Sequence, residues 1–258
     1  MVRYDDPEYA RRFGAAQRSR AFGPVAAAYE RGRPGYPDEA ARWAVSRDRG
    51  AVLDLGAGTG KLTRTLAALG YETYAVEPDD AMREVLQEAS PSTRALLGSA
   101  EAIPLPAASV DAVVVAQAWH WFDHARAAAE VMRVVRPGGY VALLYNIRDE
   151  RVPWVARFAG ATGERFGAAS EPLEFDGVRR TPGFGAVENR EFEHVERLEV
   201  DDLVALAQSF SFVALLPGDE RREVLATVEE IGRGAAGAEG IIDLPYRLFA
   251  ARAVVGIA

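Results

Sequence analysis

Residues 52–63 read V-L-D-L-G-A-G-T-G-K-L-T and carry the clearest chemical signal in the chain. An apolar run over residues 51–55 leads into three glycines, Gly56, Gly58 and Gly60, and a helical pattern follows. A glycine turn between a strand and a helix lets backbone N–H groups approach a ligand, and a helix start favours a negative group. The segment therefore predicts a site for a small molecule that bears a carboxylate or a phosphate.

The spacing of the glycines bears on which cofactor binds. A dinucleotide fingerprint reads G-x-G-x-x-G, whereas this turn reads G-x-G-x-G with the acid Asp54 ahead of it. Glu77 closes the next apolar run, over residues 71–76, where a carboxylate accepts hydrogen bonds from ribose hydroxyls. Because more than one type of cofactor contains such a ribose, Glu77 alone does not identify the cofactor.

Residues 117–122, Q-A-W-H-W-F, directly follow another apolar run over residues 110–116. His120 either deprotonates a hydroxyl or amine, because its ordinary pKa lies near neutral pH, or only forms hydrogen bonds within the loop. A substrate that reacts through a carboxylate would need no base, because a carboxylate is already deprotonated near neutral pH. The segment also contains three aromatic side chains, Trp119, Trp121 and Phe122. They either line the substrate site or fill the core beneath the next helix.

Residues 22–37 mix aromatic side chains, arginines and prolines ahead of the first strand. We expect this segment to close over the cofactor as a lid, with Tyr29 and Arg33 facing the substrate that accepts a group from the cofactor. An ordinary extension packed on the edge of the sheet is the alternative.

Apolar runs alternate with helical patterns along the first 146 residues, which predicts a parallel sheet with helices on both faces. Ligands of such sheets bind outside the carboxyl ends of the strands. The expected strands cover residues 51–55, 71–76, 94–97, 110–116 and 140–145. The expected helices cover residues 37–46, 61–69, 79–89 and 124–135.

The alternation of apolar runs and helical patterns is weaker beyond residue 146. We expect a single domain over residues 1–258, with a lid over 1–36, a cofactor-binding core over 37–146, and a cap insertion with the last strands over 147–258. The expected elements of the last part are a helix over 151–166, a cap or substrate loop to 185, a strand over 188–200, helices over 201–210 and 218–231, and a strand over 246–255. Asp201 or Asp202 is the expected N-cap.

These motifs and their order resemble the class I S-adenosylmethionine-dependent methyltransferases, and in particular small-molecule enzymes of methyltransferase type 11 that are similar to trans-aconitate methyltransferase. The resemblance implies a Rossmann-like α/β fold, a doubly wound, seven-stranded, mostly parallel sheet with an antiparallel last strand, and helical cap elements. The matching segments are residues 52–60, Glu77, G-S-A-E at 98–101, residues 110–117 and R-P-G-G at 136–139.

The resemblance also implies which residues hold S-adenosylmethionine. Ser99 stands where the family usually has an acid, so it would meet the adenine amine through its hydroxyl. The expected cofactor-binding residues are Asp54, Gly56, Ala57, Gly58, Gly60, Glu77, Pro78, Met82, Ser99, Ala100, Glu101 and Gln117. The expected substrate-side residues are Tyr29, Arg33, Trp119 and Trp121, with His120 as the catalytic base.

The expected function is methyl transfer to a small-molecule oxygen or nitrogen nucleophile, with a carboxylate as one option. A catalytically inactive S-adenosylmethionine-binding scaffold is one alternative. The other is an NAD(P)-dependent oxidoreductase, which the glycine spacing disfavours.

Composition limits the partners. A formal net charge of −8 argues against a general nucleic-acid surface, and no apolar run reaches the roughly 20 residues of a membrane span. The absence of cysteine excludes disulfides, thiolate zinc sites and a cysteine nucleophile, and the three histidines suggest no metal site. The N-terminus shows no secretory signal pattern. We expect a cytoplasmic enzyme, monomeric or homodimeric, with no membrane or nucleic-acid partner.

Overall fold

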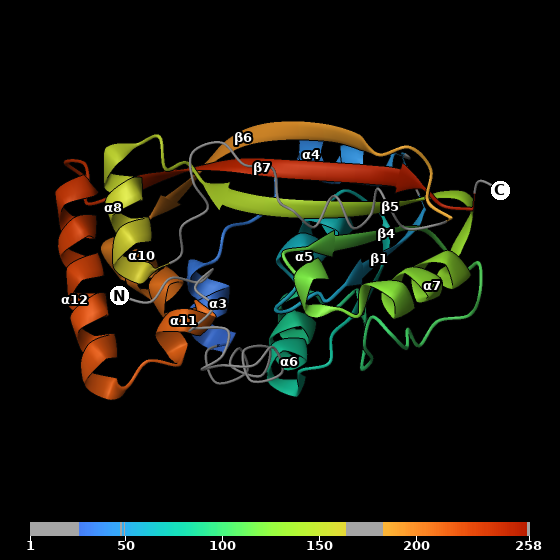
Figure 1. Ribbon diagram of the computed structural model, residues 1–258, viewed down its shortest axis with the longest axis horizontal. Helices are drawn as coiled ribbons and strands as arrows, with labels where there is room; N and C mark the ends of the chain where they lie inside the picture. Colours follow the sequence, from blue (N-terminus) through green and yellow to red (C-terminus); the bar gives the residue numbers. More distant parts are fainter. Residues whose placement is uncertain (1–25, 47, 49, 164–182, 257–258) are drawn as a thin grey trace. The chain divides into compact units, whose positions relative to one another are not determined.

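The structure is a computed structural model that describes residues 26–46, 48, 50–163 and 183–256 (Figure 1). Its strands are β1 (Ala51–Leu55), β2 (Glu72–Val76), β3 (Arg94–Leu96), β4 (Val110–Ala116), β5 (Val135–Arg148), β6 (Glu188–Leu198) and β7 (Ile242–Val254). Its helices are α3 (Ala26–Gly32), α4 (Asp38–Val45), α5 (Lys61–Ala68), α6 (Asp80–Ala89), α7 (His124–Val134), α8 (Pro153–Thr162), α10 (Val200–Gln208), α11 (Ser211–Ala214), α12 (Gly218–Ala235) and the 3-10 helix η2 (Trp119–Trp121).

The chain divides into two compact units. The core unit comprises Gly35–Asn146, Glu171–Phe192 and Leu248–Ala258, and the helical unit comprises Met1–Pro34, Ile147–Ser170 and Glu193–Arg247. The expected single domain with a lid, a core and an insertion stays a prediction, and parts of the expected lid and of the expected insertion fall in the helical unit. The start of the expected lid and most of the expected loop before residue 185 lie outside the described residues.

The seven strands form one sheet in the order β3-β2-β1-β4-β5-β7-β6. Strands β1 to β5 pair in parallel. Strand β7 runs antiparallel to β5, because Val255 N donates to the Gly139 carbonyl (2.8 Å) while Asp149 N donates to the Pro245 carbonyl (2.9 Å). The predicted Rossmann-like, mostly parallel seven-stranded fold is therefore confirmed, with antiparallel strands at its end.

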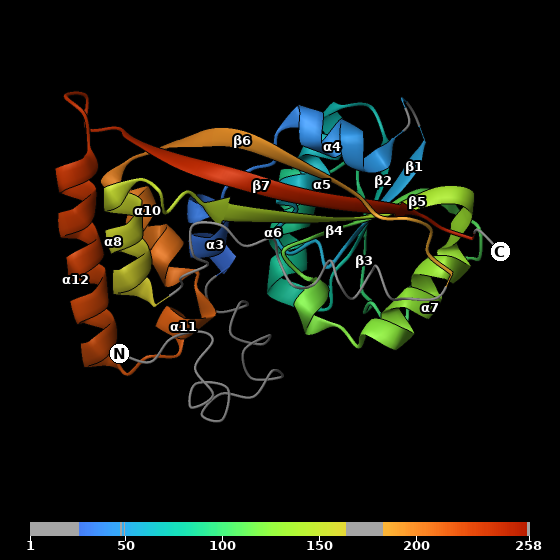
Figure 2. The ribbon, with the colours of Figure 1, turned by 45° about the horizontal axis from the view of Figure 1, so that its top comes forward.

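Both faces of the central strands are buried, which explains why these strands read as continuous apolar runs. Every residue of β1 is buried. One set of alternate side chains packs with α7, and the opposite set packs with α4 and α5 (Figure 2). The first set includes Leu53, Val113 and Leu143, and the second includes Val52, Val114 and Leu144.

Strand β5 begins earlier than the sequence suggests, because the R-P-G-G motif interrupts the strand instead of preceding it. Val110 pairs with Val135 and Ala112 pairs with Tyr140, so the intervening residues form a bulge. A Cβ on Gly139 would lie 2.4 Å from the Asp111 carbonyl oxygen. Glycine is therefore required there by the close approach of the two strands.

Several boundaries in the helical unit differ from the sequence expectation. Helix α10 starts at Val200 with Glu199 as its N-cap, not Asp201 or Asp202. Asp202 instead accepts a hydrogen bond from Glu199 N (2.9 Å), as the third residue of a capping box does. Helix α12 continues to Ala235, four residues beyond its expected end, and β7 begins four residues early.

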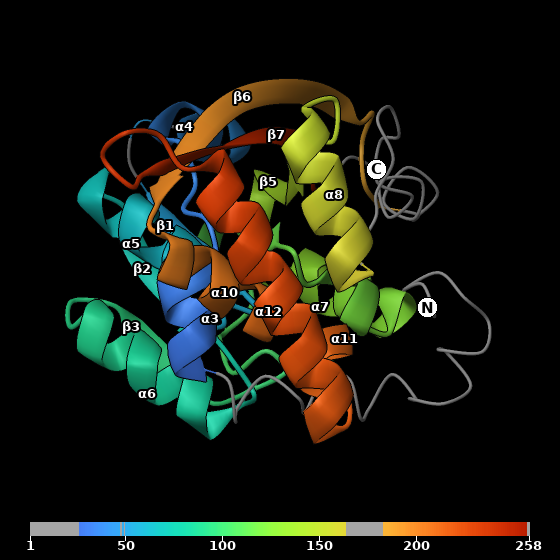
Figure 3. The same ribbon diagram turned by 90° about the vertical axis from the view of Figure 1, so that its left-hand side faces the viewer.

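In the helical unit, α10 packs on α3 and on α12, and α12 packs on α8 (Figure 3). Gly32 allows the approach of α3 to α10, because a Cβ at this position would lie 2.2 Å from Leu206 N. Phe158 and Phe210 are fully buried in the apolar core of this unit. None of the helices in the described ranges combines the length and apolar character needed to cross a membrane.

Candidate active site

The glycine turn, residues 56–60, uses most of its N–H groups within the protein. Gly56 N and Ala57 N both donate to the Val76 carbonyl oxygen, at 2.9 and 3.1 Å. Gly58 N donates to Glu77 Oε2 at 2.8 Å. The end of β2 thus supplies acceptors for these three donors, and the expectation that they bind a negative group of the ligand stays a prediction.

The glycines instead permit close packing around the turn. Gly56 has φ +73°, and a Cβ there would lie 2.8 Å from Ala118 Cβ and 3.1 Å from Phe122 Cζ. Gly60 has φ +84°, and its Cβ would lie 2.8 Å from Leu86 Cγ. Positive φ and close contact both exclude larger residues. The turn thus contacts both the segment after β4 and helix α6.

Asp54 is the last acid of β1 and is almost fully buried, with 1% of its surface exposed. Its Oδ2 accepts a hydrogen bond from Thr63 Oγ1 at 2.6 Å. Among the described residues, its Oδ1 has no hydrogen-bond partner. Burial, with a smaller contribution from the charge of Glu77, raises the pKa of Asp54 to about 7. The site therefore holds an acid that a cationic group would stabilise in its charged form.

Glu77 follows β2 and lies beside the glycine turn. Its two carboxylate oxygens accept hydrogen bonds from Gly58 N (2.8 Å) and Asp79 N (3.0 Å). Burial raises the pKa of Glu77, while the two N–H groups oppose that rise by stabilising the carboxylate. Each oxygen keeps a further lone pair that can accept a ribose hydroxyl.

The charges at the turn discriminate between the two candidate cofactors. A dinucleotide would bring its pyrophosphate to a turn whose N–H groups are taken and which lies between two buried acids, Asp54 and Glu77. S-adenosylmethionine carries a sulfonium and an ammonium group, and a cation near a buried carboxylate favours its charged form. The Oδ1 atom of Asp54 suits such a donor. The residues present fit S-adenosylmethionine.

The segment expected on the adenine side packs on the end of β2. A Cβ on Gly98 would lie 2.7 Å from Pro104 Cδ and 3.2 Å from Val76 Cγ1. Ser99 forms an isolated antiparallel bridge with Ala102. The expected apolar contacts of the adenine are available from residues that lie buried in or beside this segment, namely Met82, Ala100 and Ile103.

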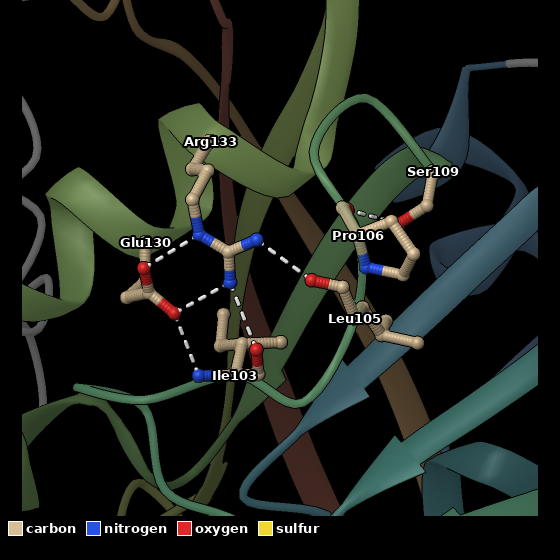
Figure 4. Close-up of polar contacts among 6 residues, drawn as sticks. All are labelled: Ile103, Leu105, Pro106, Ser109, Glu130 and Arg133. Carbon is tan, nitrogen blue, oxygen red and sulfur yellow. Dashed lines mark hydrogen bonds and ion pairs between the residues drawn. The ribbon is translucent and has the colours of Figure 1, made fainter.

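Helix α7 holds the continuation of this segment through an ion pair (Figure 4). Arg133 donates two hydrogen bonds to Glu130 (both 2.7 Å), and it also donates to the carbonyl oxygens of Leu105 (2.7 Å) and Ile103 (2.8 Å). Glu130 Oε2 in turn accepts a hydrogen bond from Ile103 N at 2.7 Å. Our sequence reasoning missed these two residues, although opposite charges three positions apart on a helix are a recognisable signal.

Gln117 directly follows β4 and has a left-handed conformation, with φ 57°. Its N donates to the Leu144 carbonyl (3.0 Å), and its Nε2 donates to the Asn146 carbonyl (2.7 Å). A non-glycine residue with positive φ is uncommon, and such residues cluster at functional sites. The two bonds to β5 maintain this conformation and set the direction in which the next segment leaves the sheet.

That next segment forms the 3-10 helix η2, which separates its aromatic side chains. Trp119 is fully buried and stacks on His124, with ring centroids 5.4 Å apart. It therefore fills the core, the packing alternative for this tryptophan. His120 and Trp121 are partly exposed, with ring centroids 4.6 Å apart. Phe122 is also partly exposed, so of the aromatic residues in 119–122 Trp119 is the fully buried one.

Tyr29 and Arg33 lie together in the helical unit. The Arg33 guanidinium stands 5.1 Å from the centre of the Tyr29 ring, and its Nε donates to Ser209 Oγ at 2.9 Å. Their expected role toward the acceptor stays a prediction.

Comparisons with known proteins find methyltransferases. The profile of a family described as a methyltransferase domain matches residues 53–143. An uncharacterized methyltransferase of Mycobacterium tuberculosis is 43% identical over 240 residues, which cover 92% of this chain and 96% of the relative. A second, from Schizosaccharomyces pombe, is 36% identical over 219 residues, covering 82% and 87%.

A solved structure of a candidate type II methyltransferase from Anaeromyxobacter dehalogenans superposes with a TM-score of 0.62 and 28% identity, covering 87% of this chain and 97% of that one. The match with the mycobacterial relative extends over nearly the whole of both chains, so it includes the core and helical units alike. The family match, the sheet order and the two buried acids agree on one cofactor. This chain belongs to the class I S-adenosylmethionine-dependent methyltransferases.

Proposed function

We propose that the protein transfers the methyl group of S-adenosylmethionine to a small-molecule oxygen or nitrogen nucleophile at the carboxyl ends of β1 and β4. One observation carries this proposal: Gly56 of the glycine turn is in close contact with Ala118 and Phe122, which flank η2. The partly exposed His120 and Trp121 therefore stand on a segment that touches the cofactor turn. The net charge of −8 favours a small acceptor over nucleic acid.

Bound S-adenosylmethionine would supply an already activated electrophile, the methyl group of a sulfonium. The protein then has to hold, align and shield the reactants. Glu77 would hold the ribose, Asp54 the ammonium group, and the residues around Ser99 the adenine. Trp121 would exclude water beside the acceptor, and His120 would take the proton that a hydroxyl or amine acceptor loses.

An acceptor panel tests the proposed function. The purified protein would be incubated with S-adenosylmethionine and with small carboxylates, alcohols, phenols and amines, and release of S-adenosylhomocysteine would be measured. We expect release with at least one of these classes. Tight cofactor binding without release across the panel would instead support the alternative of an inactive binding scaffold.

The role of His120 gives the next prediction. With a hydroxyl or amine acceptor, His120→Gln should lower kcat by about 100-fold, because general base catalysis is lost, and should leave the affinity for S-adenosylmethionine unchanged. The matched control is His124→Gln, since His124 is exposed and stacks on Trp119 from the next helix. An unchanged kcat in the His120 variant would assign this side chain a structural role.

Arg133 should act on cofactor binding from a distance, as a positioning residue. Arg133→Leu removes the bonds to the Ile103 and Leu105 carbonyls, each of which contributes about 1 kcal/mol or more with a charged donor. We expect about tenfold weaker binding of S-adenosylmethionine, with kcat at saturation nearly unchanged. Calorimetric titration and steady-state kinetics would measure both.

The matched control for Arg133→Leu is Arg126→Leu, which changes an exposed residue of the same helix. Equal cofactor affinity in the two variants would show that the ion pair does not position the adenine-side segment.

A further inference from the structure

A groove of about 690 Å³ lies in the helical unit, between α3, α10, α11 and α12 (Figure 3). All the residues that line it belong to this unit. On α10 they are Asp201, Val204, Ala205 and Gln208. These four stand three, four and seven positions apart, so they share one face of the helix over two turns. The volume is typical of a site for a small molecule.

The walls of the groove are largely apolar. Val204 and Ala205 form the wall on α10, Leu225 contributes from α12, and Ala28 contributes from α3. Of these side chains, Val204, Leu225 and Ala28 are only partly buried. A ligand in the groove would therefore remove apolar surface from water, and burying each of its own methylene groups strengthens binding about fourfold.

Arg221 of α12 brings a positive charge to this groove. Its side chain is exposed, and its Nη1 donates one long hydrogen bond, to the Ala214 carbonyl oxygen at 3.5 Å. No acidic residue stands three or four positions from Arg221 in the sequence. Across the part of the chain that the structure describes, no carboxylate forms an ion pair with Arg221. Its guanidinium group can therefore bind an anion without breaking an ion pair.

The amino end of α10 has the opposite charge balance. Asp201 lines the groove there, and the guanidinium group of Arg31 lies 4.0 Å from Asp201 and 2.6 Å from Asp202. Two acids thus share one arginine, so this end of the groove carries a net negative charge. An anionic group would be repelled by it and attracted to Arg221. The charges therefore favour one orientation of an anionic ligand.

We propose that this groove binds a small amphipathic carboxylate, with the carboxylate on Arg221 and the apolar chain along Val204, Ala205 and Leu225. A carboxylate suits Arg221 because a guanidinium group can bind both of its oxygens through two parallel N–H···O bonds. The inference does not depend on the proposed function, since no residue of the groove belongs to the core unit or to the proposed cofactor residues.

Calorimetric titration of the full chain without S-adenosylmethionine tests the site. The probes are octanoate, the uncharged octanamide and acetate, at neutral pH and one ionic strength. We expect octanoate to bind at least about tenfold more tightly than the other two, because octanamide lacks the charge and acetate lacks the apolar chain.

Two arginine variants locate the carboxylate. Arg221→Gln should weaken octanoate binding at least about tenfold, because a charge-assisted hydrogen bond is lost. The matched control is Arg222→Gln, which should bind octanoate as the wild type does. Arg222 is the next residue of the same helix, is exposed, lies outside the groove and already pairs with Asp219.

Ala28→Leu tests the apolar part of the groove, because a larger side chain there fills space without changing the charge. It should weaken octanoate binding several-fold. Three results would overturn the proposal: octanamide or acetate binding as tightly as octanoate, unchanged octanoate binding by folded Arg221→Gln, or unchanged octanoate binding by folded Ala28→Leu.

A parallel titration with S-adenosylmethionine separates this proposal from the proposed function. Wild type that binds octanoate but not the cofactor would refute the proposed function and leave the groove site standing. Wild type that binds the cofactor but not octanoate would refute the groove site alone.

Discussion

Replacing Glu77 with alanine is expected to weaken the binding of S-adenosylmethionine about 1000-fold, or about 4 kcal/mol. Two effects add. The variant loses the charge-assisted bonds to the ribose, and it leaves Gly58 N and Asp79 N without their acceptor beside the ligand; each such loss costs about 1–3 kcal/mol. Calorimetric titration with S-adenosylmethionine and S-adenosylhomocysteine would measure the change, and both ligands should lose affinity alike because they share the ribose.

The control for this variant is Glu72→Ala, which removes an exposed carboxylate from the other end of β2. It should bind both ligands as the wild type does. Circular dichroism would establish that Glu77→Ala is folded before its affinity is interpreted. A folded Glu77→Ala protein that binds the cofactor normally would contradict the site described here.

Asp54→Asn is expected to stabilise the protein at neutral and alkaline pH while weakening cofactor binding. The pKa of Asp54 rises from 3.8 to about 7 on folding, mainly because the carboxylate is buried. The folded state therefore holds the proton more tightly, so this stabilisation is complete below pH 3.8 and is lost as pH rises through about 7. The loss amounts to about 4 kcal/mol. Asparagine carries no charge at any of these pH values, so the Asp54→Asn variant does not lose this stabilisation as the pH rises.

Urea denaturation of both proteins from about pH 4 to about pH 8 would measure the effect. The stability of Asp54→Asn relative to wild type should increase with pH across this range. His194 has the opposite dependence, because burial lowers its pKa from 6.5 to about 4 and its stabilisation is lost as pH falls through that interval. Since both proteins contain His194, its contribution cancels in the difference. Parallel stability curves would show that Asp54 is not the buried acid inferred here.

The same variant tests the cofactor role of Asp54. If its free Oδ1 holds the ammonium group, Asp54→Asn should bind S-adenosylmethionine more weakly although it is more stable. Such an exchange of stability for function is common where a buried charge serves a ligand.

Much of the core unit could be predicted from the sequence because the information is local. Apolar runs such as 51–55 and 110–116 become buried parallel strands with the expected bounds. Glu77 follows the second strand, as its position after an apolar run requires. The topology of alternating strands and helices brings these strand ends to one edge of the sheet, so the cofactor class could also be inferred.

The tertiary structure alone decided how the site residues are used. The N–H groups of the glycine turn are bound by Val76 and Glu77, Trp119 points into the core, and Arg133 reaches the backbone of the adenine-side segment. Likewise, Arg33 and Arg148 lie far apart in the sequence, and only the folded chain brings both guanidinium groups to the Phe210 ring. A sequence pattern reports which face of an element is apolar, since that depends on neighbours three or four positions away. Which distant atoms meet depends on how the elements pack and which hydrogen bonds remain to be satisfied, and only the folded chain determines that.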